Sequence, residues 1–212
     1  MEKIKTEDID VLNTNITNYK IIFLGDRTVG KTSIIKCFNE KKFEESAVCT
    51  VGIDFVIKFI KRKDKKYKLD IWDTSGQERY KCLAESYCKN ADGVIFVFDI
   101  TNKQSMDNIK YWYNKIIESE NINNLACVLV GNKSDLPNQM DTNTINSFTQ
   151  KYNMKYIQVS AKNNINIDEI FVIILDELIK KEKARQKEKS LKRGVSLSNA
   201  KPVEKKKCCL SK

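Results

Sequence analysis

The sequence predicts an α/β fold with a six-stranded, mostly parallel sheet flanked by about five helices. Two observations predict this class. Short apolar runs alternate along the chain with longer segments that are typical of helices. Most of the short runs are apolar throughout, as in strands that are covered on both faces. With 212 residues, 41% of them hydrophobic, the chain is long enough to form one domain with a full core.

The first elements are a buried strand, a helix and a hairpin. The apolar run 21–24 predicts the strand, and residues 32–38 predict the helix that follows it. Two alternating stretches, 53–60 and 67–72, are separated by the polar cluster 62–66. This pattern predicts that the two stretches pair as an antiparallel hairpin.

The remaining elements alternate regularly between strand and helix. Apolar runs predict strands at 93–98, 125–130 and 156–159, with helices near 78–89, 104–119 and 142–152 and a last helix from about residue 166. Such alternation predicts parallel βαβ units. Ligands of such sheets bind at the carboxyl ends of the strands, which is where the motifs described below occur.

The net charge of +10 belongs to the end of the chain. Residues 180–212 contain 13 basic and 3 acidic residues, so residues 1–179 contain 25 of each and carry no net charge. A neutral body argues against a nucleic-acid-binding domain, whose basic patch usually lies on the folded part. The last helix can extend into the basic segment, and we expect the remainder to be disordered.

Several classes of site and location are excluded by composition. The chain has no histidine, which excludes sites built on imidazole. Its seven cysteines are odd in number and lack the CxxC spacing of zinc sites, so we expect reduced thiols in the cytosol. No run of about 18 apolar residues could cross a bilayer as a helix. The polar N-terminus does not resemble a signal peptide, which predicts a cytosolic protein.

A phosphate-loop pattern, GxxxxGK[ST], lies between the first apolar strand and the helix. The candidate nucleotide-binding residues here are Gly25, Asp26, Arg27, Thr28, Val29, Gly30, Lys31 and Thr32, with Ser33 beside them. Glycines let backbone N–H groups turn inward around phosphate oxygens, and the helix N-terminus adds a favourable field. Lys31 can reach the β- and γ-phosphates, and the Thr32 hydroxyl can ligate magnesium.

A second group of candidates follows the apolar run 69–72. The carboxylate of Asp73, at the end of this strand, can hold magnesium through water. Gly76 can bring its backbone N–H close to a γ-phosphate, and Gln77 can orient an attacking water, which makes it the candidate catalytic residue. Alone, an aspartate after a strand is more often a turn residue or a helix cap. Its position after a phosphate loop favours the metal site.

A third group predicts that the site selects guanine. Its members are Asn132, Lys133 and Asp135 after the strand 125–130, and Ser160, Ala161 and Lys162 after the last strand. The Asp135 carboxylate can accept two hydrogen bonds from the N1 and N2 edge of guanine. Adenine lacks this pair of donors and would leave buried polar groups unpaired. The backbone N–H of Ala161 can contact the guanine O6.

In these motifs the chain resembles the Ras superfamily of small GTPases, which have the P-loop NTPase fold, and in particular its Rab branch. The resemblance covers about residues 19–180 and resumes at the last five residues. The Rab-like signatures are VGIDF at 51–55, KLDIWD at 68–73, QERY at 77–80 and FVFDIT at 96–101. The chain would then consist of an N-terminal extension (1–18), a small GTPase domain (19–180) and a basic flexible tail with a prenylation motif (181–212).

The resemblance implies further roles. Thr50 matches the threonine of the first switch, which completes the coordination of magnesium and contacts the γ-phosphate. Phe43 matches the aromatic residue that packs on the guanine ring. Phe55, Trp72 and Tyr87 match an aromatic set that Rab effectors contact, although ordinary core packing is the alternative for Trp72.

Three residues depart from the pattern of the family. Arg27 occupies a phosphate-loop position that often holds a smaller residue, and Ala47 stands where the first switch often has a tyrosine over the γ-phosphate. Ser75 replaces the usual alanine of the second switch. None of these prevents nucleotide binding, but Arg27 and Ala47 bear on the rate of hydrolysis.

The chain ends KKKCCLSK, in which Cys208 and Cys209 are candidates for lipidation. Cys209 is the fourth residue from the end, so a single-lipid C-a-a-X signal is one interpretation, although Leu-Ser-Lys fits it poorly. Paired cysteines before three residues resemble a Rab tail with two geranylgeranyl groups. Two lipids give stable anchoring where one is marginal. A solvated basic tail with unmodified cysteines is the remaining alternative.

Together these features predict a switch that binds GTP and GDP with Mg²⁺, hydrolyses GTP slowly and regulates vesicle trafficking from a membrane surface. The implied partners are a guanine nucleotide exchange factor, a GTPase-activating protein, a GDP dissociation inhibitor, a Rab escort protein, a geranylgeranyl transferase and effectors, but no nucleic acid. The implied location is the cytoplasmic face of an endomembrane, Golgi or secretory, with a cytosolic pool. Two alternatives are a P-loop ATPase or kinase, against which Asp135 argues, and a nucleotide-binding scaffold that barely hydrolyses GTP.

Overall fold

The computed structural model describes residues 16–44, 50, 52–62, 64–76, 88–119 and 125–198. Six strands form one sheet in the order β2-β3-β1-β4-β5-β6. They are β1 (Thr17–Leu24), β2 (Ile53–Arg62), β3 (Lys65–Thr74), β4 (Gly93–Asp99), β5 (Ala126–Asn132) and β6 (Lys155–Gln158). Among the paired strands of the described residues, only β2 and β3 run antiparallel. The six-stranded, mostly parallel sheet and its hairpin are therefore confirmed.

Five helices lie within the described residues. They are α1 (Lys31–Glu40), α3 (Lys103–Asp107), α4 (Ile109–Ser119), α5 (Thr142–Tyr152) and α6 (Ile167–Ser198). The prediction of one helix over 104–119 is wrong, because the chain forms two helices separated at Asn108. The backbone N–H of Asn108 caps α3, while its side chain donates a hydrogen bond to Asp26. The helix predicted near 78–89 lies almost entirely outside the described residues.

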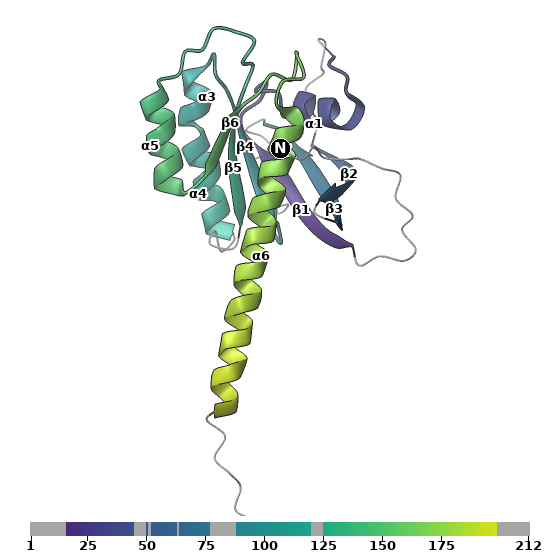
Figure 1. Ribbon diagram of the computed structural model, residues 1–212. Helices are drawn as coiled ribbons and strands as arrows, with labels where there is room; N and C mark the ends of the chain where they lie inside the picture. The colour runs from purple at the N-terminus through teal and green to yellow at the C-terminus, as the bar shows by residue number, and fades with distance from the viewer. Residues whose placement is uncertain are drawn as a thin grey trace, which may run out of the picture.

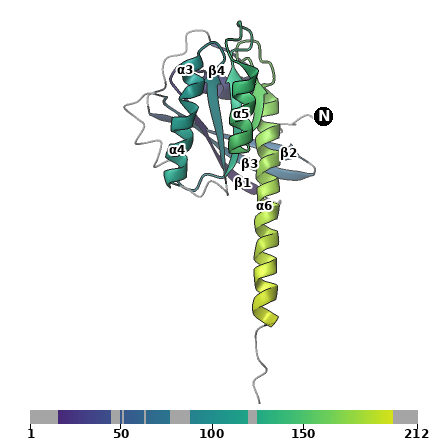
Figure 2. The same ribbon diagram turned by 90° about the vertical axis from the view of Figure 1, so that its left-hand side faces the viewer.

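The helices cover both faces of the sheet, as fully apolar strands require. Figures 1 and 2 show α1 and α6 on one face and α3, α4 and α5 on the other. On the first face, the rings of Phe38 and Phe171 stack with centroids 3.6 Å apart. On the second face, the buried Trp112 and Phe96 belong to a separate apolar cluster. The sheet is thus held rigidly between two cores, with its strand ends fixed in space.

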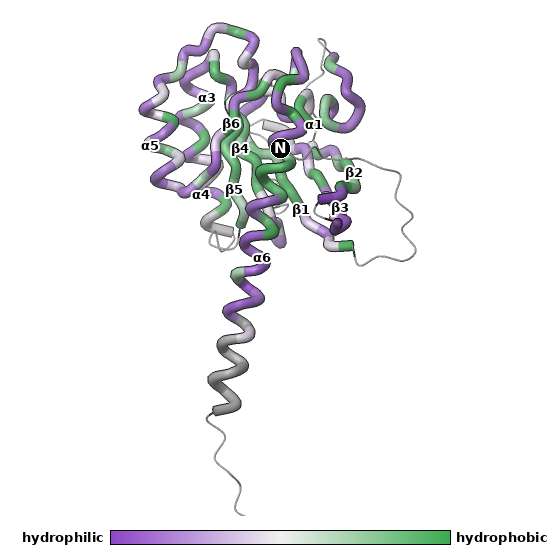
Figure 3. The backbone as a smooth tube through the Cα atoms, viewed as in Figure 1, coloured by the Kyte–Doolittle hydropathy of each residue, from purple (hydrophilic) through white to green (hydrophobic). Residues whose placement is uncertain are grey.

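Helix α6 continues beyond the body of the protein (Figure 1). Its first half is apolar and packs on the sheet, whereas the following residues are hydrophilic (Figure 3). Two contacts join the helix to the sheet where it leaves the body. The Tyr19 hydroxyl donates to Glu182, and the Lys181 ammonium donates to the carbonyl of Leu125. The helix therefore does enter the basic segment, while the division of the chain at residue 180 stays a prediction.

None of the helices within the described ranges is both long and apolar enough to cross a membrane. The 32 residues of α6 would have the length, but its second half is rich in charged residues.

The parallel strands deliver the predicted motifs to one edge of the sheet. Strand β1 ends at Leu24, just before the phosphate loop, and β3 ends at Thr74, just after Asp73. Phe23 pairs with Asp73 across β1 and β3, and Asp99 pairs with Asn132 across β4 and β5. Carboxyl ends of neighbouring strands are where ligands bind in folds of this kind.

Candidate nucleotide-binding site

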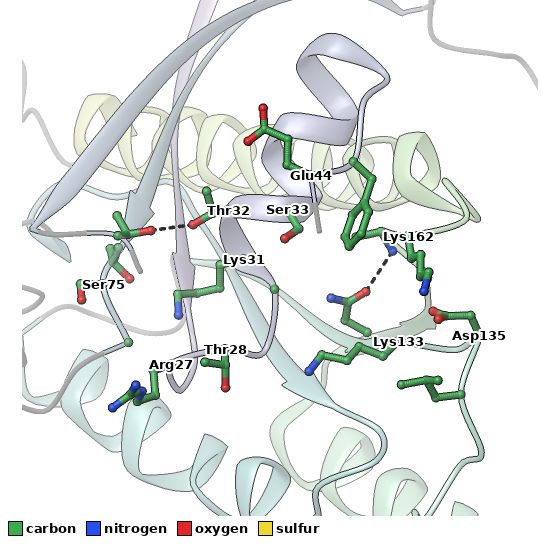
Figure 4. A pocket seen from close by; sticks show the side chains of 18 residues that line it. Arg27, Thr28, Lys31, Thr32, Ser33, Glu44, Ser75, Lys133, Asp135 and Lys162 are labelled. Atoms are coloured by element: carbon green, nitrogen blue, oxygen red, sulfur yellow. Dashed lines mark hydrogen bonds between the residues drawn. The ribbon is translucent and has the colours of Figure 1, made fainter. Parts of the chain in front are cut away.

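A cavity of about 330 Å³ opens at this edge of the sheet (Figure 4). It is lined by Arg27, Thr28, Gly30, Lys31, Thr32, Ser33, Phe43, Glu44, Thr50, Thr74, Ser75, Gly76, Asn132, Lys133, Asp135, Leu136, Ala161 and Lys162. Most of these residues belong to the three groups identified in the sequence. Residues from five separate segments of the chain therefore meet around one space, as the strand-end argument predicts.

The phosphate loop needs glycine where it touches other loops. Gly30 has φ 94°, a conformation that residues with a Cβ rarely adopt, and a Cβ there would lie 2.2 Å from Nδ2 of Asn132. Gly76 lies against the other end of the loop, since a Cβ on it would lie 2.3 Å from the backbone nitrogen of Arg27. The glycines thus allow close contact between the loop and two neighbouring motifs.

Lys31 is buried in the floor of the cavity, with only 5% of its surface exposed. Its ammonium donates hydrogen bonds to the carbonyls of Gly25, over 2.9 Å, and Asp26, over 2.8 Å. Burial lowers the pKa of Lys31 to about 8, and the nearby carboxylates of Asp73 and Asp26 oppose this shift. The loop therefore folds around a cation that faces an open space, an arrangement suited to a phosphate.

Three oxygen ligands predicted for magnesium lie together. Thr32 Oγ1 donates a 2.5 Å hydrogen bond to Oδ2 of Asp73 and lies 2.7 Å from Oγ1 of Thr50. Thr50 also donates to Asp73, over 3.4 Å. Burial raises the pKa of Asp73, while the hydrogen bond from Thr32 and the charge of Lys31 act in the opposite direction.

These three residues fit a magnesium ion. Carboxylate and hydroxyl oxygens are ligands that Mg²⁺ prefers, and the ion is commonly held by one or two carboxylates together with phosphates. The second carboxylate oxygen of Asp73, Oδ1, is buried without a hydrogen-bond partner in the described part of the chain. A nearby cation or its bound water would satisfy this oxygen, and it would also lower the cost of burying the charge.

Asn132 connects the phosphate loop to the last motif. Its Nδ2 donates to the carbonyl of Val29 over 2.8 Å, and its Oδ1 accepts from the backbone N–H of Ala161 over 3.1 Å. The asparagine is buried, so these bonds are protected from water. Val29 is also buried and does not line the cavity, although the phosphate-loop pattern predicts it as a nucleotide-binding residue. Asn132 thus fixes the distance between the two ends of the site.

Asp135 lines the far end of the cavity, where its Oδ1 accepts a 2.5 Å hydrogen bond from the hydroxyl of Ser160. The neighbouring Lys133 forms an ion pair with Asp99 over 2.5 Å. Burial alone would raise the pKa of Asp99, but hydrogen bonds from Lys133 and Thr101 outweigh it and lower the pKa. Ser160 and Asp99 therefore hold Asp135 and Lys133 in place through these contacts.

The aromatic candidates divide between the cavity and the surface. Phe43 lines the cavity and is 38% exposed. Phe55 is 42% exposed on β2, and its ring contacts Trp72 edge-on with centroids 5.1 Å apart. Trp72 is half-buried, packs against the second apolar cluster, and has the Lys20 ammonium 4.8 Å from its ring. Trp72 is therefore partly exposed beside Phe55 and also packs against the core.

Some of the predicted site residues do not line the cavity. Four of these residues are Gly25, Asp26, Asp73 and Ser160. The carboxylate of Asp26 instead binds Asn108 and Trp112. Gln77, Ala47, Tyr87, Cys208 and Cys209 lie outside the described residues.

The structure adds Glu44, Thr74, Ser75 and Leu136 to the lining of the cavity. Each of them is next to a predicted residue in the sequence, so extending each motif by one position would have identified all four. By contrast, no local pattern in the sequence predicts the ion pair between Asp99 and Lys133, because this ion pair depends on the pairing of β4 with β5.

Comparison with known proteins agrees with this geometry. A model of the Ras family matches residues 20–180. Rab-1D of Dictyostelium discoideum is 40% identical over 158 residues, which are 73% of this chain and 76% of that protein. The GTP-binding protein ypt2 of Schizosaccharomyces pombe is 36% identical over 198 residues, 90% of this chain and 95% of that protein. Rab-8 of Diplobatis ommata is 35% identical over 194 residues, or 89% and 92%. The chain therefore belongs to the Ras family and is a Rab-like small GTPase, a GTP-hydrolysing switch of vesicle trafficking.

Proposed function

We propose that the cavity binds GTP or GDP together with Mg²⁺, and that exchange between the two nucleotides switches the surface around Phe55 and Trp72. The observation that carries this proposal is the convergence of five chain segments on one cavity. A buried lysine and an oxygen cluster lie at one end, and a carboxylate lies at the other.

At the phosphate end, Lys31 and the backbone of the phosphate loop hold the phosphates. Thr32, Thr50 and Asp73 would hold the magnesium ion, Asp73 through water. The bound ion would supply positive charge that offsets the charge developing on the transferring phosphoryl group. Gln77 orients the attacking water and Gly76 donates its backbone N–H to the γ-phosphate. No protein nucleophile is required, because phosphoryl transfer depends on positioning and charge stabilisation.

At the base end, Asp135 selects guanine and Phe43 packs on the ring. The backbone N–H of Ala161 donates a hydrogen bond to Oδ1 of Asn132. In the complex it would share this hydrogen between Asn132 and the O6 of guanine. Lys133 and Lys162 line the same end of the cavity. Ser160 positions the Asp135 carboxylate through its hydroxyl. An analogue that leaves polar groups of the site unpaired binds weakly. This end of the cavity would therefore determine which base is bound.

The C-terminal residues would attach the protein to a membrane. Two prenyl groups on Cys208 and Cys209 would insert into the bilayer, and the adjacent lysines would add about 1 kcal/mol each on an anionic surface. An exchange factor, a GTPase-activating protein and a GDP dissociation inhibitor would control the cycle, and an escort protein with a geranylgeranyl transferase would attach the lipids. Effectors would bind the Phe55–Trp72–Tyr87 surface on a Golgi or secretory membrane, with a cytosolic pool of the protein.

A competition assay tests the central claim. Purified protein is loaded with a fluorescent GDP analogue at saturating Mg²⁺, and unlabelled GTP, GDP, ATP and ADP are compared as competitors. We expect GTP and GDP to compete at least a thousandfold better than the adenine nucleotides, since a site built to bind donors rejects analogues by about 10⁴ or more. Equal competition by ATP and GTP would contradict guanine selection and favour a P-loop ATPase.

A further inference from the structure

Asp26 stands in the phosphate loop, yet its carboxylate is bound entirely by another part of the protein. Oδ2 accepts a 2.6 Å hydrogen bond from Nδ2 of Asn108, and Oδ1 accepts a 3.0 Å hydrogen bond from Nε1 of Trp112. Both oxygens are thus occupied by donors from the α3–α4 junction and the first turn of α4. A carboxylate with two such donors makes a strong, directional contact, because hydrogen bonds to charged groups are stronger than hydrogen bonds between neutral groups.

The two donors are themselves held in place. Trp112 is 2% exposed and packs within the second apolar cluster. The amide oxygen of Asn108 accepts a 3.0 Å hydrogen bond from Nε2 of Gln104, one turn earlier in α3. This bond orients the amide so that its nitrogen faces Asp26. The junction therefore offers Asp26 a fixed pair of donors.

The backbone of Asp26 belongs to the nucleotide site. Its carbonyl accepts a 2.8 Å hydrogen bond from the ammonium of Lys31. The peptide that joins Asp26 to Arg27 also forms the surface against which Gly76 lies, since a Cβ on Gly76 would be 2.4 Å from the Asp26 carbonyl oxygen. One peptide thus contacts the lysine proposed for phosphate binding and the glycine proposed for the γ-phosphate.

From these contacts we propose that Asp26 is a positioning residue, through which the α3–α4 junction fixes the phosphate loop against Lys31 and Gly76. The proposal rests on the nucleotide site proposed above. Asp26 does not touch the nucleotide through its side chain. It transmits the rigidity of the Trp112 core to the Asp26–Arg27 peptide, so a displacement at Asn108 moves the phosphate-binding groups. Small displacements of such groups are costly, because about 1 Å of misplacement can reduce a rate a hundredfold.

An exchange of the two polar side chains tests this role. Asn108→Asp keeps the acceptor that Gln104 uses but sets a second carboxylate against Asp26. Asp26→Asn combined with Asn108→Asp restores a donor facing an acceptor, and the new amide oxygen can still accept from Trp112. Lys110→Ala, at an exposed position in the first turn of α4, is the control. Release of a fluorescent GDP analogue, single-turnover GTP hydrolysis and thermal unfolding are measured for each protein at saturating Mg²⁺.

We expect Asn108→Asp to accelerate GDP release about tenfold and to slow hydrolysis, because it removes a hydrogen bond to a charged group and adds repulsion. The exchange should restore both rates most of the way to wild type, and Lys110→Ala should change neither. A purely structural contact would lower the unfolding temperature of Asn108→Asp without changing release or hydrolysis, and that result would overturn the proposal. So would an exchange that restores stability but not the two rates. A wild-type protein that fails to bind the GDP analogue would overturn the proposed function and this inference with it.

Discussion

The hydroxyl of Thr32 donates a 2.5 Å hydrogen bond to the carboxylate of Asp73, although 41 positions separate the two residues in the chain. One stands at the start of α1 and the other at the end of β3. Thr50 completes the cluster from the segment between them, so three distant segments present oxygen atoms to one point. The parallel pairing of β1 with β3 produces this juxtaposition, because it aligns the ends of the two strands.

Replacing Asp73 with Asn should weaken Mg²⁺ binding by about 10- to 100-fold, the cost typical of altering a group that acts on a metal through its bound water. GDP release from the variant should then respond to magnesium only at higher concentrations than in the wild type. A magnesium titration of GDP release measures the shift. Asp54→Asn is the matched control, because Asp54 pairs with Asp73 across the hairpin but is exposed. A magnesium dependence that is unchanged in Asp73→Asn would argue against this metal site.

Replacing Asp135 with Asn should convert a guanine site into one that favours xanthine. The amide presents a donor where the carboxylate presents an acceptor, and xanthine has a carbonyl at the position of the guanine amino group. GDP affinity should fall at least about a hundredfold, while affinity for xanthosine diphosphate rises. Competition binding measures both values, and Asp141→Asn, which makes the same change at the cap of α5, serves as control. Weak binding of both nucleotides by Asp135→Asn would mean that the residue supports the fold rather than the base.

The motifs were predictable because each of them is local. Gly25 to Thr32 form the turn after β1 and the first two residues of α1, and Asp135 follows its strand by three positions. The contacts that hold these motifs together are not local. Asn132 reaches Val29 across 103 positions, and this contact follows from the order of strands in the sheet.

The break at Asn108 was missed for the same reason. Residues 104–119 have a continuous pattern of apolar residues, and that pattern predicts one helix. The side chain that marks the break bonds to Asp26, which is 82 positions away in the sequence. Local propensity carries no information about such a partner. The orientation of Asp26 away from the cavity was unpredictable on the same grounds, since it depends on Asn108 and Trp112.

The depressed pKa of Lys31 predicts a pH-dependent affinity. In the nucleotide-free protein, burial disfavours the ammonium and lowers its pKa to about 8. Phosphate oxygens favour the ammonium, so above pH 8 the complex binds more protons than the free protein does. GDP affinity should therefore fall as the pH rises through 8, by up to about tenfold per pH unit for one proton.

Calorimetric titrations with GDP between pH 7 and 9.5, in buffers of different ionisation enthalpy, measure the affinity and the proton uptake together. Lys31→Arg is the control, because arginine stays charged throughout this range and should remove the proton uptake. Equal affinity of the wild type at pH 7.5 and 9, without proton uptake, would show that Lys31 is already charged in the free protein.

Attachment to membranes should depend on Cys208 and Cys209. Changing both cysteines to Ser should move the protein from the membrane pellet to the soluble fraction, because one lipid gives marginal binding and two give stable anchoring. Each single change should give partial loss if both cysteines carry lipid. Fractionation of cells that express the four forms measures this. A double variant that still sediments with membranes would show that another part of the chain is the anchor.

Arg27 should slow the hydrolysis of GTP. Its side chain is exposed at the edge of the cavity and extends away from the Lys31 ammonium (Figure 4). Its backbone nitrogen lies beside Gly76, which we propose to contact the γ-phosphate, so the long side chain starts close to the reacting group. Crowding there would displace the water or Gln77, and about 1 Å of misplacement can cost a hundredfold in rate.

Single-turnover GTP hydrolysis by the wild type and by Arg27→Ser, at saturating Mg²⁺, measures this effect. We expect the serine variant to be faster, because a smaller side chain leaves the water free to align with the γ-phosphate. A slower variant would instead identify the guanidinium as an internal arginine finger, whose charge stabilisation is worth about 10³-fold or more in related enzymes. We favour crowding because such fingers normally approach from outside the phosphate loop. Equal rates would show that the side chain stays in solvent throughout the reaction, which would contradict the prediction.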